Sequence, residues 1–323
     1  MLLEQRGFYK PFKYGWAFNY FKQQHSHHWI AESINLTTDV TDWIGGRVSS
    51  DEKDLMTQIF RFFTQADSGV AEGYAKHFIP KFGGNPEVGM MLCAFADMEG
   101  IHQDTYSKLI DTLNLPETEY QIFKEYRAME EKDEFAKSIK TETNLELATA
   151  MAIYGAFTEG LQLFASFIIL QNITRTGRMS GMGQIVTYSQ RDETIHVEGM
   201  IRLFKEFAGE YLTQYEITGA LRGAVEEACY KCVALEDAFI DLAFDGRVIE
   251  GLTPAEVKNY IRYIANLRMK QLGFAILFPR HLKNPIDWAM NVTNLPEFAN
   301  FFDTRVTEYS KSSTKGSWGA IEL

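Results

Sequence analysis

The sequence predicts an all-α protein, and three observations support this fold class. Apolar residues recur at helical spacing through a series of long segments. Few segments alternate apolar and polar residues with the period of two that is typical of strands, so no substantial sheet is expected. The chain has only 8 prolines in 323 residues, and the stretch 117–253 contains none. Such proline-free stretches favour long helices, because proline breaks a helix interior.

Start signals divide the chain into successive helices. Ser49–Glu52 and Thr253–Glu256 have the spacing of a capping box, in which the first side chain and the fourth satisfy each other's backbone N–H groups. Asn85 and Pro86 supply an N-cap and a proline for the first helical turn. With the apolar spacing, these signals predict helices over about 49–78, 86–113, 117–139, 144–172, 181–207, 212–243 and 254–271.

Composition and charge exclude several functional classes. The chain has 32 basic and 43 acidic residues, and a net charge of −11 argues against binding to nucleic acid phosphates. Three cysteines exclude a disulfide scaffold and fit a reducing compartment. The first twelve residues lack the apolar run of a signal peptide. We therefore expect a cytoplasmic protein.

The segment 147–174 is apolar and long enough to span a bilayer, but it contains Glu159 near its middle. A lone carboxylate at the centre of a bilayer is costly, and no second apolar run of similar length could pair with this one. A helix buried in a water-soluble core, without membrane insertion, is the better interpretation. It leaves the question of why Glu159 is buried.

Two segments share the pattern E-x-x-H, namely Glu99–His102 and Glu193–His196, each inside a predicted helix. Residues three apart on a helix face the same way, so a carboxylate and an imidazole can bind one metal together. One such pattern is common by chance, whereas two in one chain are more specific. In di-iron carboxylate bundles, two helices each supply an E-x-x-H pair and two others each supply one carboxylate.

The chain also offers the two further carboxylates. Glu159 lies in the apolar segment, and Asp67 lies in a stretch that is uncharged on both sides. An unpaired carboxylate at such a position is costly unless it has a partner. Six ligands of mixed oxygen and nitrogen type suit a pair of iron or manganese ions better than structural zinc, and we favour iron. Tyr106 follows His102 by four residues on the same face, either as a one-electron donor to the metals or as an ordinary core tyrosine.

At these positions the sequence resembles the radical-generating small subunit of class I ribonucleotide reductase, a member of the ferritin-like superfamily. The resemblance covers roughly residues 8–300. The segments that carry it are ADMEGIHQDTYS (96–107), TEGLQLF (158–164), QRDETIH (190–196), PFKY (11–14) and HWIAE (28–32).

The resemblance implies a homodimer with a dimetal site in the core of four helices. It assigns the metal ligands to two groups, with one or more bridging carboxylates: Asp67, Glu99 and His102 for one metal, and Glu159, Glu193 and His196 for the other. It also implies that Tyr106 is oxidised to a stable radical, and that Trp29 and Asp192 form an electron route with His102.

The expected domain organisation is one ferritin-like domain over 1–303, including an N-terminal arm over 1–48, followed by a flexible tail over 304–323. By the resemblance, the tail docks on the large catalytic subunit and Tyr309 relays the oxidising equivalent used to reduce ribonucleotides to deoxyribonucleotides. Two alternatives remain open from the residues alone. One is a ferritin-like iron-storage protein or dimetal oxidase that acts without a large subunit, and the other is a helical module with no metal.

Overall fold

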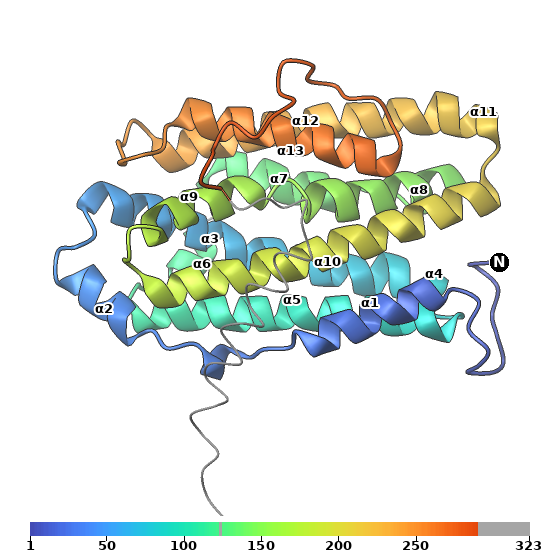
Figure 1. The fold of residues 1–323 in the computed structure, drawn as a ribbon, viewed down its shortest axis with the longest axis horizontal. Coiled ribbons are helices and arrows are strands. Elements are labelled where there is room, and N and C mark those ends of the chain that lie inside the picture. The colour runs from blue at the N-terminus through green and yellow to red at the C-terminus, as the bar shows by residue number, and fades with distance from the viewer. Residues whose placement is uncertain (123–124, 290–323) are drawn as a thin grey trace, which may run out of the picture. The chain divides into compact units, whose positions relative to one another are not determined.

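The computed structural model describes residues 1–289 except 123–124. Its five longest helices, drawn in Figure 1, are α3 (Ser50–Gly73), α5 (Pro86–Thr112), α10 (Ser180–Tyr211), α12 (Arg222–Phe244) and α13 (Pro254–Leu272). Between Met1 and Ala289, the described residues form no strand and only one isolated β-bridge, between Ile249 and Leu252. The predicted all-α fold class is confirmed.

Shorter helices complete the fold. They are α1 (Gly15–Ser26), α2 (Thr37–Ile44), α4 (Ile79–Phe82), α6 (Glu119–Ile122), α7 (Arg127–Lys137), α8 (Asn144–Met151), α9 (Phe164–Thr174) and α11 (Gln214–Glu216). Three π-helical segments, Tyr74–Phe78, Ala152–Thr158 and Ile217–Leu221, and one 3-10 turn, Ala31–Ser33, lie between them.

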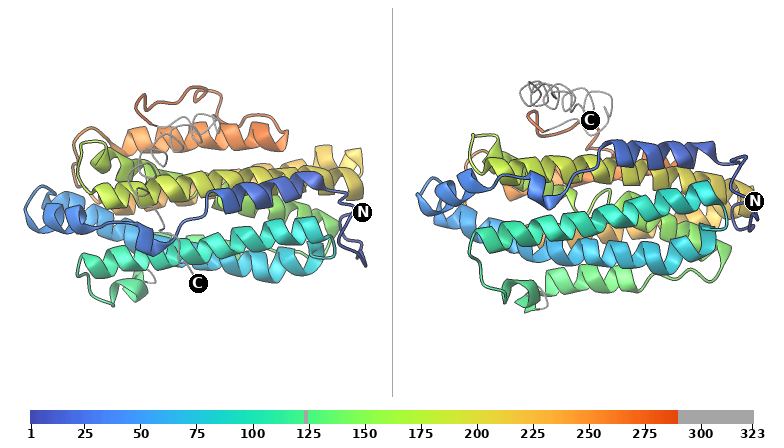
Figure 2. Two further views of the ribbon diagram at one scale, coloured as in Figure 1. Left: turned by 60° about the horizontal axis from the view of Figure 1, so that its bottom comes forward. Right: turned by 90° about the horizontal axis from the view of Figure 1, so that it is seen from below.

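Four helical segments surround the centre of this unit: α3, α5, α10, and the stretch formed by α8, the π-helical segment Ala152–Thr158 and α9. Helix α5 packs against α3 and α10, and α10 also packs against α8, α9 and the π-helical segment between them. Helix α1 lies over α5 and α10, and α12 and α13 cover the opposite side of the bundle (Figures 1 and 2). The space between the four central segments is therefore closed to water on both sides.

The predicted helix starts are largely confirmed. Ser49 and Thr253 each form a capping box with the glutamate three residues on. Pro86 begins α5 as expected, but the side-chain oxygen of Asn85 accepts no backbone N–H as a cap, and its amide group donates to the carbonyl of Leu2 at 2.7 Å.

Three predicted helices are interrupted, and three helices, α1, α2 and α4, were missed. The segment 117–139 is divided into α6 and α7, and 212–243 into α11, a π-helical segment and α12. The prediction of one continuous helix over 144–172 is wrong, because the chain leaves regular helix at Ala152 and resumes it at Phe164. The segment is apolar all round, so its sequence gives no period that would mark the break. Helices α1 and α2 lack a side-chain N-cap, which explains why no start signal marked them.

No helix in the described part of the chain combines the length and apolar character needed to cross a bilayer. The expected tail over 304–323 lies outside the described residues, as does the end of the expected domain at 303.

Candidate metal centre

The structure brings together all six of the candidate metal ligands from four helical segments. Each of the six residues is at most 1% exposed. Asp67 comes from α3, Glu99 and His102 come from α5, Glu159 follows the π-helical segment Ala152–Thr158, and Glu193 and His196 come from α10. Their ligand atoms form two groups, each with its atoms within 4.8 Å of one another, and Glu99 belongs to both groups.

The first group surrounds Nδ1 of His102. This atom lies 3.5 Å from Oε2 of Glu99 and 3.4 Å from Oε1 of Glu193. Oδ2 of Asp67 lies 4.0 Å away. Three carboxylates therefore face one imidazole nitrogen.

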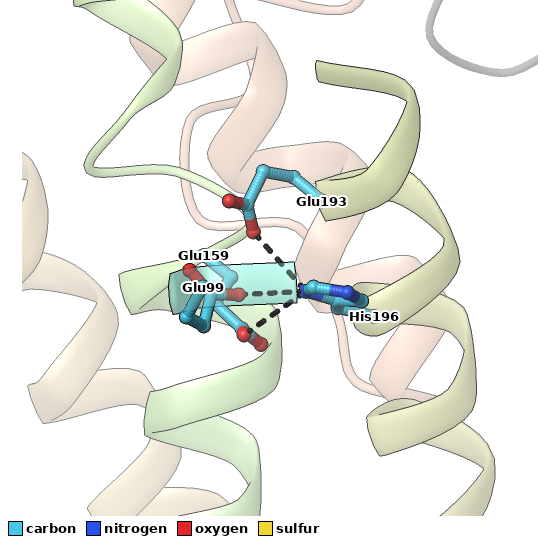
Figure 3. A group of neighbouring side chains, drawn as sticks. All are labelled: Glu99, Glu159, Glu193 and His196. Atoms are coloured by element: carbon cyan, nitrogen blue, oxygen red, sulfur yellow. Dashed lines mark ion pairs between the residues drawn. The ribbon is translucent and has the colours of Figure 1, made fainter. Parts of the chain in front are cut away.

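The second group surrounds Nδ1 of His196, as Figure 3 shows. Its distances are 2.9 Å to Oε1 of Glu99 and 3.5 Å to Oε1 of Glu159. Oε2 of Glu193 lies 3.6 Å away. Glu99 and Glu193 each direct one oxygen to each histidine, although by the 4.8 Å limit Glu193 belongs to the second group alone. Asp67 and Glu159 each lie beside one histidine.

The electrostatics of this cluster are those of a site that lacks positive charge. Burial raises the pKa of Glu159 to about 8, against the opposing effect of His196. Burial and the neighbouring Glu99 carboxylate raise the pKa of Asp67 well above its usual range. The pKa of both imidazoles is raised although burial lowers it, because the carboxylates outweigh desolvation. These shifts favour the protonated forms, and a bound metal cation would supply positive charge in place of the protons.

The hydrogen bonding also fits metal binding. In a folded core, buried polar atoms normally have partners. Within the described residues, however, seven buried atoms of the cluster lack a hydrogen-bond partner. They are Oδ2 of Asp67, both carboxylate oxygens of Glu99, Nδ1 of His102, Oε2 of Glu193, and Nδ1 and Nε2 of His196. Apart from Nε2 of His196, all of them face the interior of the cluster. Oxygen and imidazole donors at these positions fit two iron or manganese ions.

The irregular segment before Glu159 positions this ligand. The N–H of Glu159 donates to the carbonyl of Tyr154, five residues back, at 3.0 Å, which is the π-helical pattern. Gly155 lies so close to α10 that a Cβ there would be 2.3 Å from Cβ of Met200. The close approach and the π-turn together turn Glu159 toward α10. Such π-helical turns inside helices are frequent at functional sites.

Tyr74 is a functional neighbour that the sequence analysis missed. Its hydroxyl donates to both carboxylate oxygens of Glu159, at 2.8 and 3.0 Å. Burial raises the pKa of Tyr74 well above its usual range, so the phenol remains a donor. The available signal was its spacing, because Tyr74 follows Asp67 by seven residues and lies on the same side of the helix.

Asp192 connects the first group to Trp29. Oδ2 of Asp192 accepts from Nε1 of Trp29 at 2.6 Å and lies 3.4 Å from Nε2 of His102. Burial raises the pKa of Asp192, but His102, Arg191 and Trp29 outweigh it and lower the pKa to about 2. Gln24 also donates to Asp192, at 3.2 Å. Trp29, Asp192 and His102 thus lie in contact in this order, as expected. Gln24 and Arg191 also contact Asp192, and the sequence analysis missed both.

Tyr106 lies beside the first group, buried to 3% exposure. Its ring is 6.4 Å from the ring of His102 and stacks on Phe63 at 4.7 Å. The ring of Phe167 lies 5.5 Å from the ring of Phe63. Burial and the Asp67 carboxylate raise the pKa of Tyr106 well above its usual range, so its phenol is neutral. Tyr309 lies outside the described residues.

In this chain two E-x-x-H pairs and two further carboxylates meet in the core of a helical bundle. This arrangement defines the class of ferritin-like dimetal proteins. The chain belongs to the ribonucleotide reductase small-chain family, whose model matches residues 6–285. This membership confirms the resemblance found in the sequence.

Named relatives agree with this membership. The chain is 40% identical to the probable ribonucleoside-diphosphate reductase small subunit 048L of Invertebrate iridescent virus 3, over 98% of this chain and 88% of that one. It is 27% identical to the ribonucleoside-diphosphate reductase subunit beta of Chlamydia pneumoniae, over 95% of this chain and 91% of that one.

Solved structures support the fold. The ribonucleotide reductase R2 subunit from Clostridium botulinum superposes with a TM-score of 0.78 at 24% identity, covering 85% of this chain and 87% of that one. The dimanganese(II)-NrdF structure from Streptococcus sanguinis superposes with a TM-score of 0.73 at 20% identity, covering 86% and 98%.

Proposed function

We propose that this chain is the small subunit of a class I ribonucleoside-diphosphate reductase and holds two metal ions in the buried cluster. The observation that carries the proposal is the convergence of four buried carboxylates at 2.9–4.0 Å around the Nδ1 atoms of two buried histidines. Glu99 and Glu193 would each help to hold both metals, because each carboxylate faces both histidines. Iron and manganese both suit the donor set, and we favour iron.

The bound metal pair would supply a one-electron oxidising equivalent, and the protein residues would store and conduct it. Tyr106 is the proposed site of storage, because Phe63 and burial keep water from its phenol. Asp192 joins His102 to Trp29 through short contacts, which makes these residues the proposed route for an electron to the protein surface. Buried, hydrogen-bonded aromatic side chains suit this role, since their positions do not change during transfer.

The oxidising equivalent is then delivered to a large catalytic subunit, which reduces ribonucleotides to deoxyribonucleotides. The proposed assembly is a cytoplasmic homodimer that binds the large subunit through the tail over 304–323. In this proposal Trp318, Ile321 and Leu323 are the apolar anchors of the tail, and Tyr309 relays the equivalent. None of the relatives described above is a storage protein or an oxidase without a large subunit.

Reconstitution with iron or manganese tests the proposal. The metal-loaded chain, mixed with its large subunit, should form deoxyribonucleotides and, in the iron form, show a tyrosyl signal by electron paramagnetic resonance. The variant Tyr106→Phe should keep both metals and lose the signal and the activity. A chain that binds two metals but never supports nucleotide reduction would refute the proposed function. Full activity of Tyr106→Phe would refute storage on this residue and favour manganese as the site of the oxidising equivalent.

Truncation tests the tail separately. Removing residues 316–323 should leave the metal content unchanged and abolish turnover with the large subunit, because the apolar anchors are lost. A peptide of the tail sequence should compete with the intact chain for the large subunit. Full turnover by the truncated chain would show that docking does not depend on the tail.

A further inference from the structure

Ser189 is a buried polar residue that the proposed function does not use. It lies on α10, is 0% exposed, and its hydroxyl has no hydrogen-bond partner in the residues that the structure describes. Serine and threonine hydroxyls inside helices commonly bond to the carbonyl four residues back. Thr187 and Thr194 on the same helix do so, each at 2.7 Å. A buried hydroxyl without a hydrogen bond costs folding free energy. A group near Ser189 that becomes a hydrogen-bond acceptor in another state of the protein would remove this cost.

The register of two helices places Ser189 beside Tyr106. His102 lies 3.4 Å from Glu193, and Glu99 lies 2.9 Å from His196. Higher residue numbers on α5 thus pair with lower residue numbers on α10. The two helices are therefore antiparallel, as Figure 1 also shows.

One turn further along the same faces, Tyr106 follows His102 by four residues and Ser189 precedes Glu193 by four. The two side chains accordingly meet one turn beyond the metal ligands.

The electrostatics of Tyr106 show the same contact. Burial raises the pKa of Tyr106 most strongly, and the Ser189 hydroxyl opposes this effect by favouring the charged phenolate. Phe63 stacks on the Tyr106 ring at 4.7 Å, and the Asp67 carboxylate and His102 are also near enough to act on the pKa of Tyr106. Ser189 therefore brings a neutral hydrogen-bond donor to the phenolic oxygen.

We propose that the Ser189 hydroxyl donates a hydrogen bond to the oxygen of oxidised Tyr106 and stabilises the radical. In the reduced state the phenol carries its own proton. Oxidation removes one electron, which the oxidant supplied by the bound metals would take, and the phenolic proton, which the neighbouring Asp67 carboxylate can accept. The phenoxyl oxygen can then only accept, and a serine hydroxyl can rotate to donate to it. Ser189 holds no metal and moves no electron in this proposal, so it is a positioning residue for the stored equivalent. The inference rests on the proposed function, because it requires that Tyr106 becomes oxidised.

Electron–nuclear double resonance on the iron-loaded full chain tests the inference. The wild-type radical should show a coupling to one exchangeable proton that disappears in D₂O, and Ser189→Ala should lose this coupling. The largest principal g value of the radical should also rise in Ser189→Ala, since a hydrogen bond to the phenoxyl oxygen lowers it. Metal content should be unchanged. The matched control is Ser166→Ala, which removes another buried hydroxyl without a partner, on α9, and should leave both readings unchanged.

The outcomes separate the two proposals. A wild-type radical without an exchangeable coupling, or a coupling that persists in Ser189→Ala, overturns the role of Ser189 and leaves the proposed function intact. A wild-type chain that binds iron but forms no tyrosyl radical overturns both the storage role of Tyr106 and the inference on Ser189.

Discussion

The contact of Tyr74 with Glu159 predicts unequal effects on the two metals. The Tyr74 hydroxyl donates to Oε1 and Oε2 of Glu159 at 2.8 and 3.0 Å, and both residues are buried. Glu159 faces His196 and belongs to the second ligand group alone. The variant Tyr74→Phe removes the donor and keeps the ring, so it should weaken the metal at His196 and spare the metal at His102.

The size of the effect follows from the charge on Glu159. A hydrogen bond to a charged group contributes about 1.5–3 kcal/mol, and each 1.4 kcal/mol is a factor of about ten in affinity. Loss of a residue that orients a metal ligand typically weakens metal binding about 10–100-fold. We therefore expect the affinity of one metal to fall by about 10–100-fold in Tyr74→Phe.

Competition with a chelator of known affinity measures this change. The wild type and Tyr74→Phe are titrated with Mn²⁺ and then with Fe²⁺ under anaerobic conditions, and the two binding steps are fitted separately. Tyr260→Phe is the control, because Tyr260 is a buried tyrosine on α13 outside the cluster. Equal weakening of both steps, or no change in either, would refute the assignment of Tyr74 to one metal.

Three further predictions concern the core, the electron route and the metal. Lys132 of α7 donates to Glu236 of α12 at 2.7 Å, and both are buried. In chemical denaturation, Glu236→Leu should lose about 3–5 kcal/mol of unfolding free energy, and adding Lys132→Met should restore most of it. A double variant weaker than the single one would contradict this. Trp29→Phe should keep both metals by metal analysis and lose nucleotide reduction, because Asp192 loses the donor at 2.6 Å; retained turnover would exclude the route. In thermal unfolding, metal at 100 times its Kd should add about 2.7 kcal/mol to the free energy of unfolding and raise the Tm by about 5 °C. An unchanged Tm would contradict metal binding in the core.

The local pattern of the sequence was enough to predict the members of the cluster. Each E-x-x-H pair lies on one helix, and Glu159 and Asp67 are conspicuous as charges in apolar surroundings. Helical geometry then determines that such side chains face inward, and the shared burial follows from the all-α fold.

The arrangement of the ligands could not be predicted in the same way. That Glu99 and Glu193 face both histidines depends on side-chain directions across two helices. The interruption before Glu159 was missed because a segment that is apolar all round has the same sequence pattern in a regular α-helix and in a π-helix. The contact of Lys132 with Glu236 was also beyond local pattern, since it joins residues 104 positions apart.

Anomalous diffraction from crystals of the metal-loaded chain, collected at the iron and manganese edges, tests the central claim most directly. The account predicts two metal positions per chain, one beside Nδ1 of His102 and one beside Nδ1 of His196. The carboxylates of Glu99 and Glu193 should contact both metals, and Asp67 should contact the first alone. A single metal position, or two positions that share neither Glu99 nor Glu193, would contradict it.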